Sequence, residues 1–501
     1  MNFEVVAFVL YFVMVLGIGV FFFFRTRREG ESERQYFLGG RQMGPWVTAL
    51  SAQASDMSAW LLMGLPGSVL AFGLGKAWIG IGLAIGTALN WIFVAKRLRK
   101  FSKASGDAIT LPEYLQNRFL AKTPVLSIIA AVVFLISFTI YVASGFVAGT
   151  TVFVSLVPGL TREVAMVIFA AVILVYTFLG GFKAVSWTDF FQGTLMFIAL
   201  LAVPIVCVLA EDLDPASVNT IYTNLNDGTE YAFVASVFNA SWQDIVSGLA
   251  WGLGYFGMPH ILVRFMAIRK PSEIKKSATI AIIWVTISLA ASLIIAYLGR
   301  MVVAGELLPE GLQPTVFIHL ARRYFPPFLS GILLAAIIAA SMSTADSQLL
   351  VASSSFTNDI YHPLIRKNAS DKELLWVGRG VVAVVAIIAY FLASARGSGA
   401  QAIMDLVENA WGLFGAAFGP VVLLSVFWKR FNYWGAVAGI VGGALVDILW
   451  YNLLSSTGVY ELFPGFVAGM LCAVVVTLLT KAPSEDVVAI FDKATDPDYD
   501  E

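Results

Sequence analysis

Long apolar stretches follow one another along almost the whole chain, and this succession is the strongest constraint on its fold. A membrane-spanning helix needs about 20 predominantly apolar residues, and thirteen stretches approach or exceed that length. They lie at 3–24, 45–72, 75–95, 124–157, 163–181, 188–210, 232–263, 277–303, 327–356, 375–395, 402–428, 432–453 and 460–480. Charged residues make up only 13% of the chain, whereas about a quarter is usual in a soluble domain. The sequence therefore predicts an all-α integral membrane protein with about 13 transmembrane helices.

The loops between these stretches are short and unequal in charge. None is long enough for a soluble domain, so we predict one transmembrane domain over residues 1–481 and a short cytoplasmic tail over 482–501. Of the 32 Lys and Arg residues, 26 lie in one set of alternate segments and six in the other. Basic residues concentrate in cytoplasmic loops. We therefore expect the N-terminus outside, the C-terminus in the cytoplasm and an odd number of spans.

Two of the predicted spans are interrupted by helix-breaking residues. The second span contains MGLPG at 63–67, and the seventh contains GLAWGLGYFGMPH at 248–260. These spans lie five apart, so spans 2–6 and 7–11 form two groups that each open with a broken helix. Because five is odd, the second group would enter the membrane from the opposite side. Matched interruptions in two inverted halves indicate a LeuT-type 5+5 inverted-repeat core with a binding site near the midplane.

A set of oxygen donors is predicted between the second and ninth spans. Ala340, Ser343 and Thr344 share one helical face, because they are spaced three and four residues apart. Ala54 and Met57 lie where the second span would unwind and free its carbonyl groups. Carbonyls and hydroxyls without a titratable group suit Na⁺. The alternative is that the hydroxyls only pack helices or bond to their own backbone.

An acid stands in the middle of the broken second span. Asp56 is flanked by Ser55 and Ser58 in a stretch that is otherwise apolar enough to enter a bilayer. A charge at this depth costs roughly 2.5–3.5 kcal/mol on insertion scales, so such residues usually line a cavity or form a pair. We therefore expect half of an ion and solute site here, or a kinked span with one paired acid.

Aromatic residues near the breaks predict a small pocket. Tyr141 lies in the fourth span, and Trp251 and Tyr255 lie four residues apart between glycines of the seventh. They could enclose a compact solute that approaches the backbone at the glycines, or they could only pack. Arg41 and Asp189 face the cytoplasm in the predicted topology, where they would gate the inner mouth or form fixed structural pairs.

Several other classes of protein are disfavoured by what the chain lacks. Cys207 and Cys472 both lie in apolar spans, and they offer no disulfide framework or metal-ligand spacing. No GxxxxGK[ST] loop is present, so ATP-driven pumping has no support. We found no metal motif or catalytic dyad within the spans, and we predict that the protein is not an enzyme.

Six segments in order resemble the bacterial sodium/proline symporters of the sodium:solute symporter family. They extend the resemblance from about residue 10 to about residue 485, and they read ALSAQASDMSAWLLMGLPG, FTIYVASG, GGFKAVSWTDFFQ, WGLGYFGMPHILVRFMA, MSTADSQLLVASS and WGLFGAAFGPVVLL. The resemblance implies a thirteen-helix protein with the N-terminus outside. Ala59, Met258 and Asp346 depart from residues common in the family, which leaves the fine substrate preference open.

The resemblance also implies roles for individual residues. The sodium site would comprise the carbonyls of Ala54, Met57 and Ala340 and the hydroxyls of Ser343 and Thr344. Ser55, Asp56 and Ser58 match positions implicated in sodium and substrate binding, and Tyr141, Trp251, Tyr255 and Pro259 match the proline pocket. Arg41 and Asp189 match positions that influence coupling or access.

The function implied is Na⁺-coupled uptake of L-proline by alternating access. The partners would be L-proline, Na⁺ and the lipid bilayer of a bacterial cytoplasmic (inner) membrane, with Na⁺ as the coupling ion and no organic cofactor, nucleic acid or obligate protein partner. The alternative is a symporter of the same family for another small solute, such as pantothenate, a sugar or an organic acid. A channel also remains open on the residues alone.

Overall fold

A computed structural model describes residues 3–29, 33–157, 159–395 and 400–500, and most of them lie in helices. Parts of the predicted domain and tail (1–2, 30–32, 158, 396–399 and 501) fall outside the described residues, but none of the predicted site residues does. The strands found are β1 (Tyr222–Thr223) and β2 (Glu230–Tyr231), which pair antiparallel in the long loop after α9. The boundary between 481 and 482 stays a prediction.

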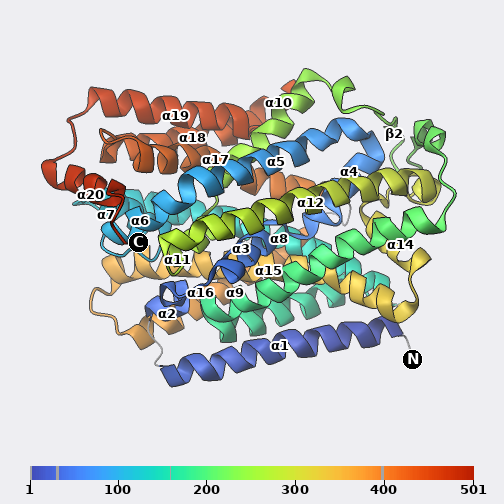
Figure 1. The fold of residues 1–501 in the computed structure, drawn as a ribbon, viewed down its shortest axis with the longest axis horizontal. Coiled ribbons are helices and arrows are strands. Elements are labelled where there is room, and N and C mark those ends of the chain that lie inside the picture. Colours follow the sequence, from blue (N-terminus) through green and yellow to red (C-terminus); the bar gives the residue numbers. More distant parts are fainter. Residues whose placement is uncertain (1–2, 30–32, 158, 396–399, 501) are drawn as a thin grey trace.

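The helices run roughly parallel to one another along the molecule (Figure 1). The first group contains α3 (Pro45–Asp56), α4 (Gly64–Phe72), α5 (Ala77–Leu89), α6 (Lys96–Ala104), α7 (Leu111–Arg118), α8 (Val125–Leu156) and α9 (Arg162–Ala210). The second contains α10 (Trp242–Ala250), α11 (Pro259–Ala267), α12 (Ile274–Val302), α13 (Ala304–Leu307), α14 (Val316–Tyr324), α15 (Pro327–Ser355), α16 (Asp371–Ala395) and α17 (Ala400–Phe427). The flanking helices are α1 (Phe3–Glu29), α2 (Glu33–Leu38), α18 (Tyr433–Leu453), α19 (Leu462–Leu479) and α20 (Glu485–Thr495).

Most of the predicted spans are long, apolar helices. Among the described residues, ten helices are long and apolar enough to cross a membrane, and the bent pair Trp242–Phe256 and Pro259–Ala267 makes up to eleven. The two other predicted spans are the short helices of 45–72 and the first part of α9, which bends at Gly181. Gly181 has a φ of 59°, a conformation that favours glycine. The count of thirteen stays a prediction.

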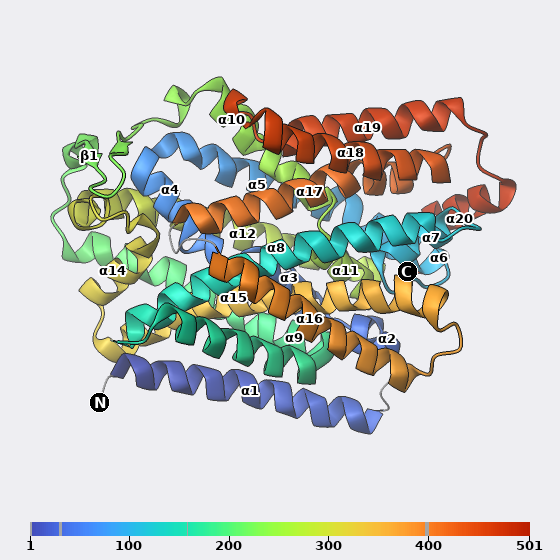
Figure 2. The same ribbon diagram turned by 180° about the vertical axis from the view of Figure 1, so that it is seen from behind.

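The helix α15 lies at the centre of the bundle, and α1 and the pair α18–α19 lie at opposite edges (Figure 2). In an apolar 18-residue stretch of Pro327–Ile365, which contains α15, 83% of the residues are buried. In the corresponding stretch of α1 only 33% are buried. The centre of α15 reads AASMSTADS, and small side chains of this kind let neighbouring backbones approach closely in a membrane protein. The start of α1 and the helix α20 lie at opposite ends of the bundle (Figure 1), as an odd number of crossings requires.

Candidate functional site

The second predicted span is broken immediately after Asp56. Helix α3 ends there, and Met57 (φ −80°, ψ 72°) and Ser58 (φ −56°, ψ −175°) leave the helical conformation. The Ser58 hydroxyl accepts a hydrogen bond from the Trp60 backbone N–H at 3.2 Å and so caps the short turn Ala59–Leu61. The last carbonyls of a helix have no partner within it. The break therefore releases backbone oxygens in the interior of the bundle.

Helix α15 brings hydroxyls to this break. The Ser343 hydroxyl donates to the Ala54 carbonyl oxygen, with 2.7 Å between the oxygens, and it lies 3.2 Å from the carbonyl oxygen of Ala340. The Thr344 hydroxyl is buried, with no hydrogen-bond partner among the described residues. The five predicted sodium-site residues, Met57 included, expose at most 3% of their surface. A buried hydroxyl that lacks a partner costs free energy unless a ligand satisfies it, so the donor set fits a hard cation.

Asp56 links the two broken spans. Its Oδ2 accepts a hydrogen bond of 2.5 Å from the hydroxyl of Tyr255, which lies in the break of the seventh span. Ser55 instead donates to the carbonyl of Ser51 at 2.6 Å, one turn back in its own helix. Asp56 is 4% exposed. Among Ser55, Asp56 and Ser58, Asp56 is the residue whose side chain contacts the second break.

The second break consists of a 3-10 turn over Trp251–Phe256, followed by Gly257 and Met258 before α11 begins at Pro259. Proline suits a first helical position because its missing N–H has no partner there anyway. Trp251 stacks on Trp60 from the first break, with 5.3 Å between ring centroids, and packs against Tyr460 at 5.2 Å. Of the predicted pocket residues, Trp251 therefore meets aromatic residues of the first break and of the chain after α18.

Glycines make this break possible because α17 passes very close to it. A Cβ at position 254 would lie 2.0 Å from Trp411 Nε1, and one at position 257 would lie 2.3 Å from the Phe414 carbonyl oxygen. Trp411 Nε1 donates to the Trp251 carbonyl at 2.9 Å and so satisfies a backbone group that the break exposes. Helix α17 thus holds the second break in place.

Trp60, Trp411 and Tyr460 were not predicted from the sequence to contact Trp251. The two tryptophans lie in recognisable segments, DMSAWLL and WGLFG, but nothing local ties them to Trp251. Tyr460 lies in the loop before α19, and no pattern marks it. Tyr141, which was predicted, is buried in α8, with its ring centroid 6.3 Å from that of His260.

Arg41 and Asp189 lie in two separate polar networks. Asp189 is fully buried, and its Oδ2 lies 2.7 Å from the Ser51 hydroxyl and 3.2 Å from Arg264 Nη2. Arg41 instead forms an ion pair of 2.7 Å with Asp107 and donates to the Met266 carbonyl. Both networks attach to α11. Arg264 was missed as a partner because it lies 75 residues from Asp189.

Conventional metal ligands do not cluster in the part of the chain that the structure describes. Among residues 3–29, 33–157, 159–395 and 400–500, no group of three or more His, Cys, Asp or Glu could hold a metal ion. Cys207 and Cys472 are free thiols. The candidate cation site therefore rests on the contacts of Ser343 and the burial of Thr344 described above.

Comparison with known proteins agrees with this geometry. The sequence profile of the sodium:solute symporter family matches residues 36–443. The high-affinity proline transporter PutP of Bacillus subtilis is 44% identical over 96% of this chain and 99% of its own, and the sodium/proline symporter of Escherichia coli is 43% identical over 96% and 93%.

Two solved structures share the fold. A Na⁺-coupled sialic acid symporter in a substrate-bound outward-open state has a TM-score of 0.76 at 21% identity, and covers 97% of this chain and 99% of its own. Mhp1, a nucleobase-cation-symport-1 family transporter in a closed conformation, has a TM-score of 0.51 at 14% identity, covering 91% and 98%. The predicted all-α, LeuT-type architecture is confirmed.

Proposed function

This chain belongs to the sodium:solute symporter family, and we propose that it couples inward movement of Na⁺ to the uptake of L-proline. It is a multi-pass membrane transporter and not an enzyme. The observation that carries the proposal is the contact between the Ser343 hydroxyl and the Ala54 carbonyl, which joins α15 to the break after α3. Sodium/proline symporters that are 40–44% identical over nearly the full chain support proline as the solute.

Na⁺ binds between the carbonyls of Ala54, Met57 and Ala340 and the hydroxyls of Ser343 and Thr344. The ion is a partner for the Thr344 hydroxyl, which has none among the described residues. It also binds the Ala54 carbonyl oxygen, which accepts a hydrogen bond from Ser343 in this structure. These donors come from two helices, so the bound ion holds α15 against the broken span. A ligand shifts a conformational equilibrium only by its difference in affinity for the two states. Na⁺ thus favours the state in which α3 and α15 are close.

L-Proline binds beside the ion in the pocket of Tyr141, Trp251, Tyr255 and Pro259. Its ring packs against Trp251 and Tyr255, and its carboxylate lies near the ion or the start of a half-helix, where backbone N–H groups point outward. Asp56, with Ser55 and Ser58 beside it, shapes the same region through its bond to Tyr255. Because this bond joins the two breaks, ion binding and solute binding affect each other.

Transport requires the site to open to each side in turn. The sodium-site residues are closed off from solvent in this structure. Opening toward the cytoplasm would separate α11 from its neighbours, and the networks of Arg41 and Asp189 both hold α11. We propose that these two residues control access on that side. Each charge that moves inward gains about 2.3 kcal/mol per 100 mV of membrane potential, in addition to the sodium gradient.

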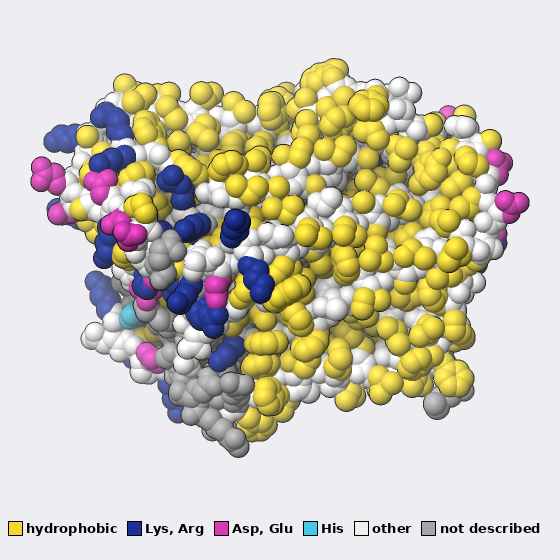
Figure 3. Space-filling model, in the orientation of Figure 1, with side chains coloured by type: hydrophobic (Ala, Val, Ile, Leu, Met, Phe, Trp, Pro, Cys, Tyr) yellow, Lys and Arg dark blue, Asp and Glu magenta, His cyan; other side chains and the backbone are white. Residues whose placement is uncertain are grey.

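The N-terminus lies outside and the C-terminus in the cytoplasm in our proposal. The excess of basic residues in one set of loops supports it, and Figure 3 shows Lys and Arg side chains gathered at the end of the molecule that carries α20. The remainder of that face is largely apolar (Figure 3), as a lipid-facing surface would be. The protein would lie in the cytoplasmic membrane of a bacterium.

Radiolabelled proline uptake into proteoliposomes tests this function. We expect saturable accumulation with an inward Na⁺ gradient and little uptake with K⁺ in its place. Unlabelled L-proline should compete, whereas pantothenate, sugars and organic acids should not. Competition by one of those solutes instead of proline would assign the chain to another substrate within the family, and flux without accumulation would indicate a channel.

A further inference from the structure

Arg99 of α6 binds the chain at the end of α11. Its Nε donates to the Ile268 carbonyl oxygen at 2.8 Å, and its Nη2 donates to the Arg269 carbonyl oxygen at 3.2 Å. Only 2% of its side chain is exposed. The last carbonyls of a helix lack partners within it and carry partial negative charge, so they suit a guanidinium. Arg99 therefore holds the helix that we propose moves when the transport site opens toward the cytoplasm.

A carboxylate from the C-terminal segment, residues 485–500, holds this base. Asp500 Oδ2 lies 2.6 Å from Arg99 Nη1, and 11% of the Asp500 side chain is exposed. Its Oδ1 pairs with Lys103, whose side chain is 43% exposed. Loss of one partner from a buried ion pair leaves a charge without compensation, whereas exposed pairs contribute little. Asp500 therefore acts mainly on Arg99.

Arg41 binds the end of α11 in the same way. It donates to the Met266 carbonyl and forms its ion pair of 2.7 Å with Asp107. Each of the two arginines thus contacts a carbonyl at the end of α11 on one side and a carboxylate on the other. The acids differ in origin, because Asp107 lies in the loop between α6 and α7, whereas Asp500 lies 401 residues after Arg99. The C-terminal segment therefore reaches the end of α11 through one buried base.

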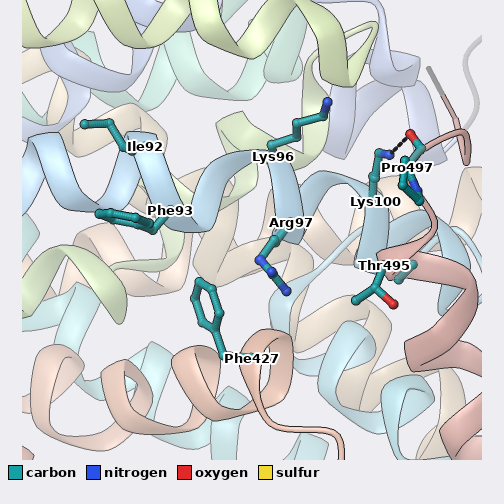
Figure 4. Close-up of a pocket in the computed structure, with 9 residues that line it drawn as sticks. Ile92, Phe93, Lys96, Arg97, Lys100, Phe427, Thr495 and Pro497 are labelled. Atoms are coloured by element: carbon teal, nitrogen blue, oxygen red, sulfur yellow. Dashed lines mark hydrogen bonds between the residues drawn. The ribbon is translucent and has the colours of Figure 1, made fainter.

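The C-terminal segment is docked on α6 before it reaches Arg99. Helix α20 and α6 lie at the same end of the bundle in both views (Figures 1 and 2). The buried ring of Phe491 meets that of Phe101 with 5.2 Å between centroids. Lys100 Nζ donates to the Pro497 carbonyl oxygen at 2.8 Å, and Figure 4 shows this bond. The packing of α20 and the Lys100 bond together keep Asp500 beside Arg99.

The bonds from Arg99 to the end of α11 exist only while α6 and α11 are together. Opening toward the cytoplasm would separate α11 from its neighbours, and α6 is one of them. A contact that is made in one conformation and lost in the other shifts the equilibrium between them. The ion pair with Asp500 keeps Arg99 in the position from which it reaches α11, so it favours the closed conformation.

We propose that the C-terminal segment restrains the cytoplasmic opening of the transporter, and that Asp500 is a positioning residue that holds Arg99 against the end of α11. While the segment is docked, the closed conformation is favoured. When Asp500 leaves, Arg99 loses its buried acid and the end of α11 separates from α6 more easily. The proposal rests on the proposed movement of α11 and not on the identity of the transported solute.

Hydrogen–deuterium exchange of the full-length protein in detergent tests this restraint, with no Na⁺ or proline added. The Arg269 N–H donates to the Met43 carbonyl at 3.0 Å, and the Met43 N–H donates to the Ala267 carbonyl at 3.3 Å. These two amides exchange when the end of α11 opens. In Asp500→Asn, which removes the charge and keeps the shape, the peptides that contain them should exchange about tenfold faster. Peptides of α18 and α19 should be unchanged.

Two further variants separate this role from a general effect of the segment. Asp498→Asn removes an exposed carboxylate two residues away and should leave exchange unchanged. Arg99→Met should itself speed exchange at the end of α11, and adding Asp500→Asn to it should give no further increase, because the acid acts through the base.

Unchanged exchange in Asp500→Asn would overturn the proposal. So would a further increase in the double variant, an equal increase in Asp498→Asn, or an equal increase in α18 and α19. None of these outcomes bears on proline uptake, which is measured separately, so a failure of the transport function and a failure of the restraint can be told apart.

Discussion

Helices α3 and α10 both stop inside the bundle, but the two breaks are made by different residues. The first break follows an acid and is held by polar groups, with Ser58 capping the next turn and Ser343 reaching its freed carbonyl. The second is a run of glycines and aromatic rings against which α17 packs without a gap. A hydrogen bond from the Tyr255 hydroxyl to the Asp56 carboxylate connects the two breaks. We infer that the first break mainly binds the ion and the second mainly forms the solute pocket.

The largest effect should come from adding one methyl group at the second break. In Gly257→Ala, the new Cβ would lie 2.3 Å from the Phe414 carbonyl oxygen and 2.7 Å from the Gly419 nitrogen. Both are backbone atoms, so α17 must move, and overpacking costs about 1–3 kcal/mol or more. We expect most of the folded protein to be lost, measured as the monodisperse peak in detergent. Gly44→Ala meets nothing within 4 Å and is the control; equal yields would contradict the close packing.

Removal of the two α15 hydroxyls beside the first break should weaken Na⁺ binding while the protein still folds. Ser343→Ala with Thr344→Ala deletes two proposed Na⁺ ligands. The Na⁺ concentration for half-maximal proline uptake should rise on the order of a hundredfold, because bonds to charged groups contribute about 1.5–3 kcal/mol each. Ser354→Ala is a control in the same helix, since its hydroxyl donates only to the Val351 carbonyl one turn back. Unchanged uptake at low Na⁺ would show that α15 does not contribute to the ion site.

The aromatic wall should affect the solute more than the ion. Trp251→Ala removes a ring that stacks on Trp60 and packs against Tyr460. Proline affinity should fall on the order of thirtyfold, and the Na⁺ requirement should change by less than about threefold, both measured in proteoliposomes. Trp434→Ala deletes a ring that is 58% exposed and should change neither. Equal losses for the ion and for proline would mean that Trp251 supports both breaks alike.

The bond between the breaks can be tested by a double-mutant cycle. Tyr255→Phe removes the donor to Asp56 without removing the ring, and it should weaken both proline and Na⁺ binding about tenfold. Asp56→Asn removes the charge. If the two side chains act through this bond, the double variant should lose less than the product of the single losses. Fully multiplicative losses in uptake assays would show that the breaks work independently.

The two interrupted spans could be predicted from local sequence patterns, whereas the contacts between distant helices could not. Glycine and proline in MGLPG and GLGYFGMPH marked the two interrupted spans, although the first helix ends earlier, after Asp56, and Gly64, Pro66 and Gly67 lie in the first turns of α4. Ser343 and Thr344 could be placed on one face because helical periodicity is local. Arg264 and Trp411 could not be predicted as partners, since they contact Asp189 and Trp251 only after helices distant in sequence pack together. Likewise, the docking of the tail on α6 depends on Lys100 and carbonyls almost 400 residues away.

The smallest effect should come from the outer end of the second broken span, where no ion or solute binds. Ser241 caps α10 by accepting from the Asp244 N–H at 3.1 Å, and it also donates to the Asp244 carboxylate at 2.7 Å. Ser241→Ala should lower stability by about 1 kcal/mol, as loss of a helix cap usually does, and Ser241→Gly should cost less. Thermal unfolding in detergent measures both, and proline uptake should stay within about twofold of the unmodified chain. A larger fall in proline affinity would mean that the solute pocket extends from the break to the start of α10. Ion binding and solute binding would then be divided between whole spans and not between the two breaks.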